Sequence, residues 1–195
     1  MITRALDLTI ILLYQNRKMK VSRKVKTVTL IILSVIAIGF SFNENTVIPV
    51  QGATNKDWNH STFWYEPWGK SGVHKGIDVF FKAGTPVISS TPGIVIYTGN
   101  VNLGGKVVAV LGPKWRIHYY AHLDNTNVSI GAFVDASEII GEVGNTGNAK
   151  GKPSHLHYSI ITLLPYIWRW DMSSQGWKKM FFLNPSKKLL SIKKN

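Results

Sequence analysis

Three short stretches of the sequence carry side chains that can bind a metal ion. They contain four of the six histidines of the chain and one aspartate: His74-Lys-Gly-Ile-Asp78, Tyr120-Ala-His122-Leu and His155-Leu-His157. They are so far apart in sequence that only tertiary folding can bring them together. Histidine and aspartate are ligands that zinc accepts in an open catalytic site, where three protein ligands leave a fourth position for water. The residue types therefore indicate a zinc hydrolase.

Residue spacing predicts how some of these side chains are oriented. His155 and His157 are two residues apart, so in a strand both point to the same face of the sheet. His118, Tyr120 and His122 also share one parity within an expected strand, which predicts that His118 faces the same side as His122. We expect His118 to be hydrogen-bonded or exposed rather than part of the catalytic group.

The region from 74 to 163 has the pattern of a β domain. Short apolar or alternating runs are separated by Gly, Pro, Asn and Asp, and they cover 79–81, 86–88, 93–97, 106–111, 115–122, 133–134, 139–140 and 157–161. Gly76 lies between His74 and Asp78, which favours a loop running into a strand over a helix there. Many short strands with turn residues between them predict an all-β fold, a sandwich or a barrel.

The positive charge of the chain lies at its two ends. Residues 1–26 have seven Lys/Arg and one acid, residues 178–195 have six lysines and no acid, and the stretch between them is nearly neutral. A nucleic-acid-binding domain instead concentrates its basic residues on one face, so we expect no nucleic-acid partner. Basic ends fit topology signals and attraction to an anionic surface such as a membrane or a cell wall. The chain has no cysteine, which excludes disulfides, thiolate metal sites and cysteine nucleophiles.

An uncharged apolar stretch, 27–42, follows a basic flank. This order is typical of an export signal or a membrane anchor whose positive side stays in the cytoplasm. No small-x-small cleavage site follows the stretch, which favours an uncleaved anchor. A start at Met19 would give an ordinary bacterial signal region, so Met1 and Met19 both stay open as the first residue.

The expected organisation has five parts. They are a basic N-terminal segment (1–26), a signal peptide or transmembrane anchor (27–42), a polar linker (43–57), the β domain (58–186) and a basic tail (187–195). Aromatic residues gather on either side of the metal-binding stretches. We expect Trp168, Trp170 and Trp177 to pack in the core, although tryptophans also gather at membrane interfaces. Trp64, Tyr65 and Trp68 either line a groove or pack a loop onto the sheet.

The three stretches together resemble the signature of the lysostaphin/LytM-type zinc metalloendopeptidases. The resemblance covers about residues 70–163, and its frame includes Gly76-Ile-Asp78, Gly84-Thr-Pro-Val87, Ile139-Ile-Gly-Glu-Val-Gly-Asn-Thr-Gly147 and Ser154-His-Leu-His157. It implies an antiparallel β fold with an active-site groove, one zinc ion, and cleavage of peptide cross-links in bacterial cell-wall peptidoglycan. The protein would then work in the cell envelope after export across the inner membrane.

The resemblance also assigns roles to individual residues. His74, Asp78 and His157 would bind the zinc ion, and His122 and His155 would be the catalytic residues beside it. A neutral histidine can take a proton from water, and a protonated one can donate to the leaving amine. Which of His122 and His155 does which stays open, as do the peptide bond cleaved, the need for an activator and the oligomeric state.

Two other functions compete with the endopeptidase. One is a non-catalytic regulator that has the same fold and activates another peptidoglycan hydrolase, and the other is a membrane-tethered protein that only binds the wall. Degenerate metal ligands would mark the regulator, but all five site residues are present. The sequence therefore favours the enzyme.

Overall fold

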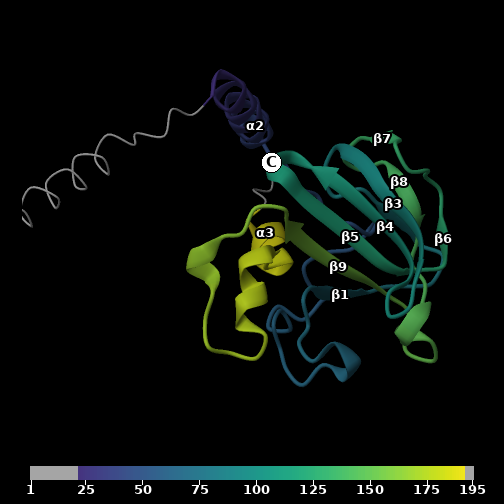
Figure 1. The fold of residues 1–195 in the computed structure, drawn as a ribbon. Helices are drawn as coiled ribbons and strands as arrows, with labels where there is room; N and C mark the ends of the chain where they lie inside the picture. Colours follow the sequence, from purple (N-terminus) through teal and green to yellow (C-terminus); the bar gives the residue numbers. More distant parts are fainter. Residues whose placement is uncertain (1–21, 192–195) are drawn as a thin grey trace, which may run out of the picture. The chain divides into compact units, whose positions relative to one another are not determined.

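The computed structural model describes residues 22–191 (Figure 1). The described chain divides into two compact units, with the boundary between Ile38 and Gly39. The predicted apolar segment is a helix, α2 (Arg23–Ser41), which is long and apolar enough to cross a membrane by length and composition. Most of the basic N-terminal segment, including Met19, lies outside the described residues.

The second unit is built from antiparallel strands, which confirms the predicted all-β class. Seven strands form the larger sheet, in the order β1-β9-β5-β4-β3-β7 with β10 also paired to β9. They are β1 (Ile77–Phe80), β3 (Gly93–Val101), β4 (Gly105–Gly112), β5 (Arg116–Leu123), β7 (Phe133–Val134), β9 (His155–Thr162) and β10 (Phe182–Leu183). A smaller sheet has the order β2-β8-β6, from β2 (Pro86–Ile88), β8 (Ile139–Glu142) and β6 (Asn125–Thr126).

The long strands β3, β4, β5 and β9 run side by side and carry the core on one face (Figure 1). Successive residues of a strand point to opposite faces, so alternate residues of these strands face the core. Val108, Val110, Tyr120, Tyr158 and Ile160 are fully buried members of this core. The opposite face of β5 and β9 lines a groove.

The C-terminal part folds against β9. It includes the short helices η4 (Ile167–Arg169), η5 (Gly176–Phe181) and α3 (Pro185–Leu190). Asn184 caps α3, since its side chain accepts a hydrogen bond from the backbone N–H of Lys187, and Pro185 follows as the first helical residue. The expected basic tail is therefore helical as far as Leu190, and residues 192–195 lie outside the described part.

The expected linker is wrong for residues 44–50, which pack into the β unit. Val50 belongs to the core and pairs with Val87 through an isolated β-bridge. The Glu44 side chain is 0% exposed and forms ion pairs with Arg116 and with Lys188, whose Nζ lies 2.9 Å from Oε2. The polar composition of this stretch did not predict its burial, because a single acidic residue whose cationic partners are remote in sequence gives no periodic signal.

The Glu44 carboxylate connects three distant parts of the chain. Its Oε1 lies 3.2 Å from Nε2 of His118, whose Nδ1 lies 2.7 Å from the hydroxyl of Tyr158. Burial by itself raises the pKa of Glu44, but the bonds to His118 and Lys188 and the charge of Arg116 outweigh it and lower the pKa to about 2. The carboxylate is therefore ionised at neutral pH and holds α3 and β5 to the segment that follows α2.

We predict that Glu44→Gln lowers the free energy of unfolding by about 3 kcal/mol at pH 7, because it leaves the partly buried side chains of Arg116 and Lys188 without their counter-charge. A carboxylate whose pKa is lower in the folded protein than in the unfolded chain stabilises the fold at any pH above its unfolded pKa. This stabilisation is lost as the pH falls through the pKa of the folded state. The wild-type advantage should therefore shrink as the pH falls from 4.5 toward about 2. Urea unfolding across this range measures it. Glu138→Gln, at an exposed site, is the control, and equal stability of both variants would contradict the prediction.

Candidate metal and catalytic site

The register of three neighbouring strands brings the candidate metal ligands together. Asp78 of β1 lies directly opposite His157 of β9, and His157 lies opposite Ala121 of β5. Residues opposite each other in an antiparallel pair project to the same face. Asp78 and His157 therefore lie side by side on the groove face, and His74 reaches them from the loop before β1.

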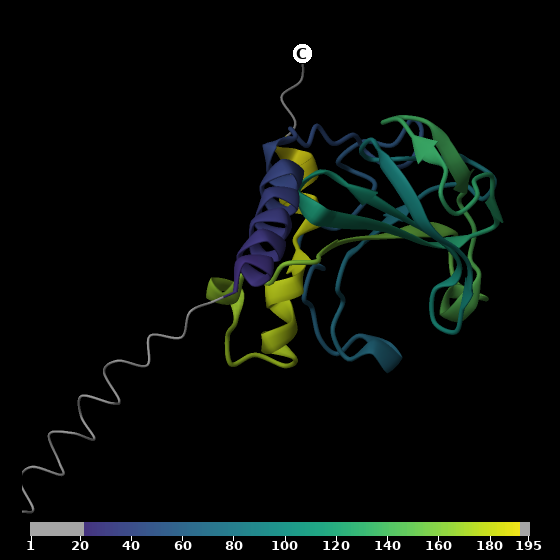
Figure 2. The ribbon, with the colours of Figure 1, turned by 45° about the horizontal axis from the view of Figure 1, so that its top comes forward.

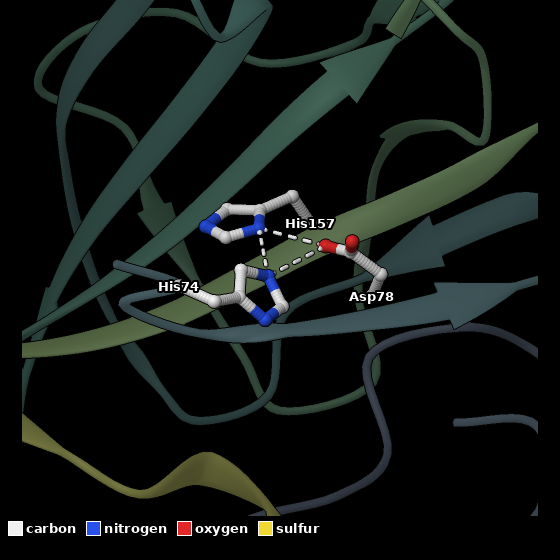
Figure 3. A group of neighbouring side chains, drawn as sticks. All are labelled: His74, Asp78 and His157. Atoms are coloured by element: carbon white, nitrogen blue, oxygen red, sulfur yellow. Dashed lines mark hydrogen bonds and ion pairs between the residues drawn. The ribbon is translucent and has the colours of Figure 1, made fainter. Parts of the chain in front are cut away.

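Three side-chain atoms meet at one point of this face (Figure 3). The Oδ1 of Asp78 lies 2.8 Å from Nδ1 of His157 and 3.0 Å from Nε2 of His74. The two ring nitrogens are 3.2 Å apart. All three atoms lie within 4.8 Å of one another, the closeness that ligands of one metal ion require.

Hydrogen bonds on the far side of each ring fix which nitrogen carries the proton. Nδ1 of His74 lies 3.1 Å from the carbonyl oxygen of Thr62 and can only donate to it. The Ser159 hydroxyl donates to the carbonyl of Lys75, so its oxygen accepts from Nε2 of His157 at 3.0 Å. The facing nitrogens of His74 and His157 are thus lone-pair atoms. Partners of this kind orient metal-binding histidines generally.

The charge of the group calls for a cation. Burial raises the pKa of Asp78, but the close contacts with the imidazoles of His157 and His74 outweigh it and hold the pKa of this carboxyl well below its usual range. Burial also lowers the pKa of His157, which keeps this ring neutral near pH 7. Two lone pairs and a carboxylate facing one another are stable only with a proton or a metal ion among them. Two imidazoles and one carboxylate fit zinc, with a position left open.

His122 and His155 flank the group. Their rings are 5.0 Å apart, and the His122 ring is 5.9 Å from that of His157. Nδ1 of His122 donates to the carbonyl of Thr146 at 2.9 Å, and Nδ1 of His155 donates to that of Pro153 at 2.8 Å. Each ring therefore offers Nε2 as a proton acceptor. Burial, and then the charges of His157 and His155, lower the pKa of His122 to about 4.

The backbone at His122 explains why it reaches the groove. Tyr120 lies opposite Tyr158 on the core face of the sheet, so simple alternation would place His122 on that face too. His122 instead has a φ of 65°, a left-handed conformation that residues other than glycine seldom adopt. This conformation turns its side chain to the groove. The prediction that His118 faces the same side as His122 is therefore wrong, because His118 stays in the core with Glu44.

The groove around these side chains has a volume of about 770 Å³. All five candidate residues line it, and its walls include Trp68, Tyr119, Leu103 and Phe182. Trp68 stacks on the ring of His74 with ring centres 4.0 Å apart. Sequence reasoning missed Ser159, although it lies two residues after His157 and so faces the groove by strand alternation.

Residues 72–166 match the model of peptidase family M23. This part of the chain is an M23 peptidase domain. The chain is 32% identical over 113 residues to the L-Ala–D-Glu endopeptidase of Bacillus subtilis, in an alignment that covers 53% of this chain and 35% of that protein. It is 36% identical over 88 residues to the peptidoglycan DD-endopeptidase ShyA of Vibrio cholerae, which covers 45% of this chain and 20% of that protein.

The fold comparison agrees with the family. The catalytic domain of lysostaphin from Staphylococcus simulans matches with a TM-score of 0.52 and 29% identity, over 64% of this chain and 86% of that chain. The predicted resemblance to lysostaphin/LytM-type peptidases is thus confirmed. The chain spans about a third or less of the length of the two enzymes compared by sequence, so the M23 domain is what they share.

We predict that Ser159→Ala weakens zinc binding by roughly 10- to 100-fold, because the His157 ring loses the partner that fixes its tautomer. Competition with a chromophoric chelator measures the affinity. Ser154→Ala is the matched control, because its hydroxyl also donates to a carbonyl, that of Phe81, yet it does not contact a candidate ligand. Equal affinity of the two variants would contradict the tautomer argument.

Proposed function

We propose that the protein is a zinc-dependent endopeptidase that hydrolyses peptide cross-links of bacterial peptidoglycan. The observation that carries the proposal is the convergence of the ligand atoms of His74, Asp78 and His157 in a groove that also presents His122 and His155. The M23 family and relatives named as endopeptidases support the reaction class. ShyA, named as a peptidoglycan endopeptidase, supports the substrate class.

In this proposal one zinc ion is held by His74, Asp78 and His157. When bound, it supplies a Lewis acid that polarises a peptide carbonyl and makes a water molecule more acidic. The neutral Nε2 of His122 or His155 accepts a proton from water. The same nitrogen, once protonated, donates that proton to the leaving amine. The other ring would bind the developing negative charge in its protonated form, because its Nδ1 proton is already donated to a backbone carbonyl.

The groove walls would hold the substrate peptide. Phe182, Leu103 and Ala121 give the groove an apolar lining next to the histidines. Such a lining excludes water and suits a peptide chain, and the buried imidazoles then act in a medium of low dielectric constant. The rigid strands β5 and β9 keep the reacting groups in place while the substrate binds.

We also propose that the protein is exported and stays anchored through α2. The basic flank before α2 would remain in the cytoplasm, and the β domain after it would face the wall. The candidate span of 19 residues supports this location. The regulator proposed as an alternative from the sequence has no structural observation in its favour.

We predict that purified peptidoglycan incubated with the protein releases cross-link cleavage products, and that a chelator stops the release. His122→Ala should lower kcat by roughly 10²–10⁴-fold, the usual loss for a general acid–base residue, while still binding one zinc ion. Mass spectrometry of the fragments measures the products, and metal analysis measures the zinc. His60→Ala is the control, since its exposed histidine lies outside the groove.

Two results would contradict this function. Products that persist in full after His157→Ala would show that the group at His74 and Asp78 is not the catalytic centre. A zinc-loaded protein that releases no fragment, but activates a second hydrolase, would instead establish the regulator.

A further inference from the structure

The segment from Leu163 to Trp177, here called the aromatic loop, exposes large apolar side chains. Met172 is 89% exposed and Trp168 is 76% exposed. Four more apolar residues of the loop are also exposed, namely Leu163, Ile167, Trp170 and Trp177. The expectation that the tryptophans pack in the core is therefore wrong. A group of this kind on one short segment marks an interaction surface rather than scattered exposure.

The backbone of the aromatic loop is nevertheless held in place. The backbone N–H of Tyr166 donates to the backbone carbonyl of Met180 at 2.9 Å. The Nε–H of the Arg169 side chain donates to the backbone carbonyl of Lys179 at 3.1 Å. At the far end, the indole N–H of Trp64 donates to the carbonyl of Ser174 at 3.1 Å. The exposed apolar side chains of the loop therefore project from an ordered backbone, as in a preformed binding surface.

Basic residues follow the aromatic loop directly in the chain. The loop itself has one basic residue, Arg169, and one acid, Asp171, and six lysines and no acid lie between 178 and 195. Two of these lysines are paired within the protein, Lys179 with Asp171 and Lys188 with Glu44. Tryptophan beside lysine and arginine is the composition found where proteins meet the headgroup region of a membrane, because the rings are amphipathic and the cations pair with lipid phosphates. The charge favours a bilayer that contains anionic lipids.

The loop is tied to the point where the chain leaves α2. Arg116 donates through Nη2 to the hydroxyl of Tyr166 at 3.3 Å, and through Nη1 to the carboxylate of Glu44. Glu44 is three residues beyond Ser41, the last residue of α2. Three residues span at most about 10 Å, so the end of α2 cannot be far from the Glu44 anchor. The chain therefore enters the β unit beside the aromatic loop.

We propose that the aromatic loop docks the M23 domain on the surface of an anionic bilayer, with Ile167, Trp168, Trp170 and Met172 entering the headgroup region. The inference rests on the proposed anchoring of α2 and not on the proposed catalysis. The loop is also hydrogen-bonded to the wall of the groove. The side-chain amide of Gln175 donates to the carbonyl of Ser71, a residue that lines the groove, at 3.0 Å. Docking thus fixes the height of the groove above the membrane and directs the enzyme to wall peptides close to it.

The absence of cysteine from the chain permits a direct test with single-cysteine reporters. The full chain would be reconstituted in phosphatidylglycerol-containing vesicles after labelling Met172→Cys with an environment-sensitive fluorophore. Phe133→Cys is the matched control, since Phe133 is 78% exposed but belongs to β7. Figures 1 and 2 both show β7 at the opposite side of the β unit from the aromatic loop (yellow-green).

We predict that lipid-borne spin labels quench the reporter at 172 several-fold more strongly than the reporter at 133. Replacing Trp168 and Trp170 by Ser in the Met172→Cys chain should abolish most of this difference while the chain still floats with the vesicles. Phosphatidylcholine alone should give weaker quenching than the anionic mixture. Circular dichroism of each variant checks the fold.

Four results would overturn the docking surface. They are a water-like reporter at 172 in vesicles, equal quenching at 133, a full chain that does not float with vesicles, and shielding at 172 only when peptidoglycan is added. The last would assign the loop to substrate or wall binding. The quenching signal does not depend on hydrolysis. A protein that docks on vesicles but releases no fragments from purified peptidoglycan would contradict the proposed function and leave the docking surface standing.

Discussion

The position of β9 between β1 and β5 is the constraint on which the site depends. Pairing with β1 puts His157 opposite Asp78, and pairing with β5 puts it opposite Ala121, next to His122. A one-residue slip of either pair would send His157 into the core, because strand side chains alternate between faces. The core side of the same strands prevents the slip, since Tyr158 and Ile160 are fully buried there.

Two local features, in addition to the strand register, position the side chains of the site. The left-handed backbone at His122 brings a residue of core parity into the groove, and strain of this kind gathers at functional sites. The Ser159 hydroxyl relays a hydrogen bond from His157 to the carbonyl of Lys75, so the nitrogen of His157 that faces Asp78 and His74 keeps its lone pair. Both features lie on strands of the large sheet, which would suit the proposed binding of a small cation and a reacting peptide.

Sequence predicted the β class from short apolar runs separated by turn residues. It predicted the grouping of His74, Asp78, His122, His155 and His157 through the resemblance of three separate stretches to the lysostaphin/LytM-type signature. It could not predict the side of His118, since a single φ angle at His122 breaks the parity on which the argument relied. It also missed the burial of Glu44, whose partners Arg116 and Lys188 are remote in sequence. The exposure of Trp168 and Trp170 escaped prediction because composition does not distinguish an apolar residue in the core from one at a docking surface.

X-ray absorption at the zinc edge of the zinc-loaded chain tests the central claim most directly. We predict one zinc ion per chain with two imidazole nitrogens and one carboxylate oxygen at about 2.0–2.2 Å. His157→Ala should remove one imidazole from that shell, and His122→Ala should leave the shell unchanged. A chain that binds no zinc, or a shell that loses an imidazole in His122→Ala but not in His157→Ala, would contradict it.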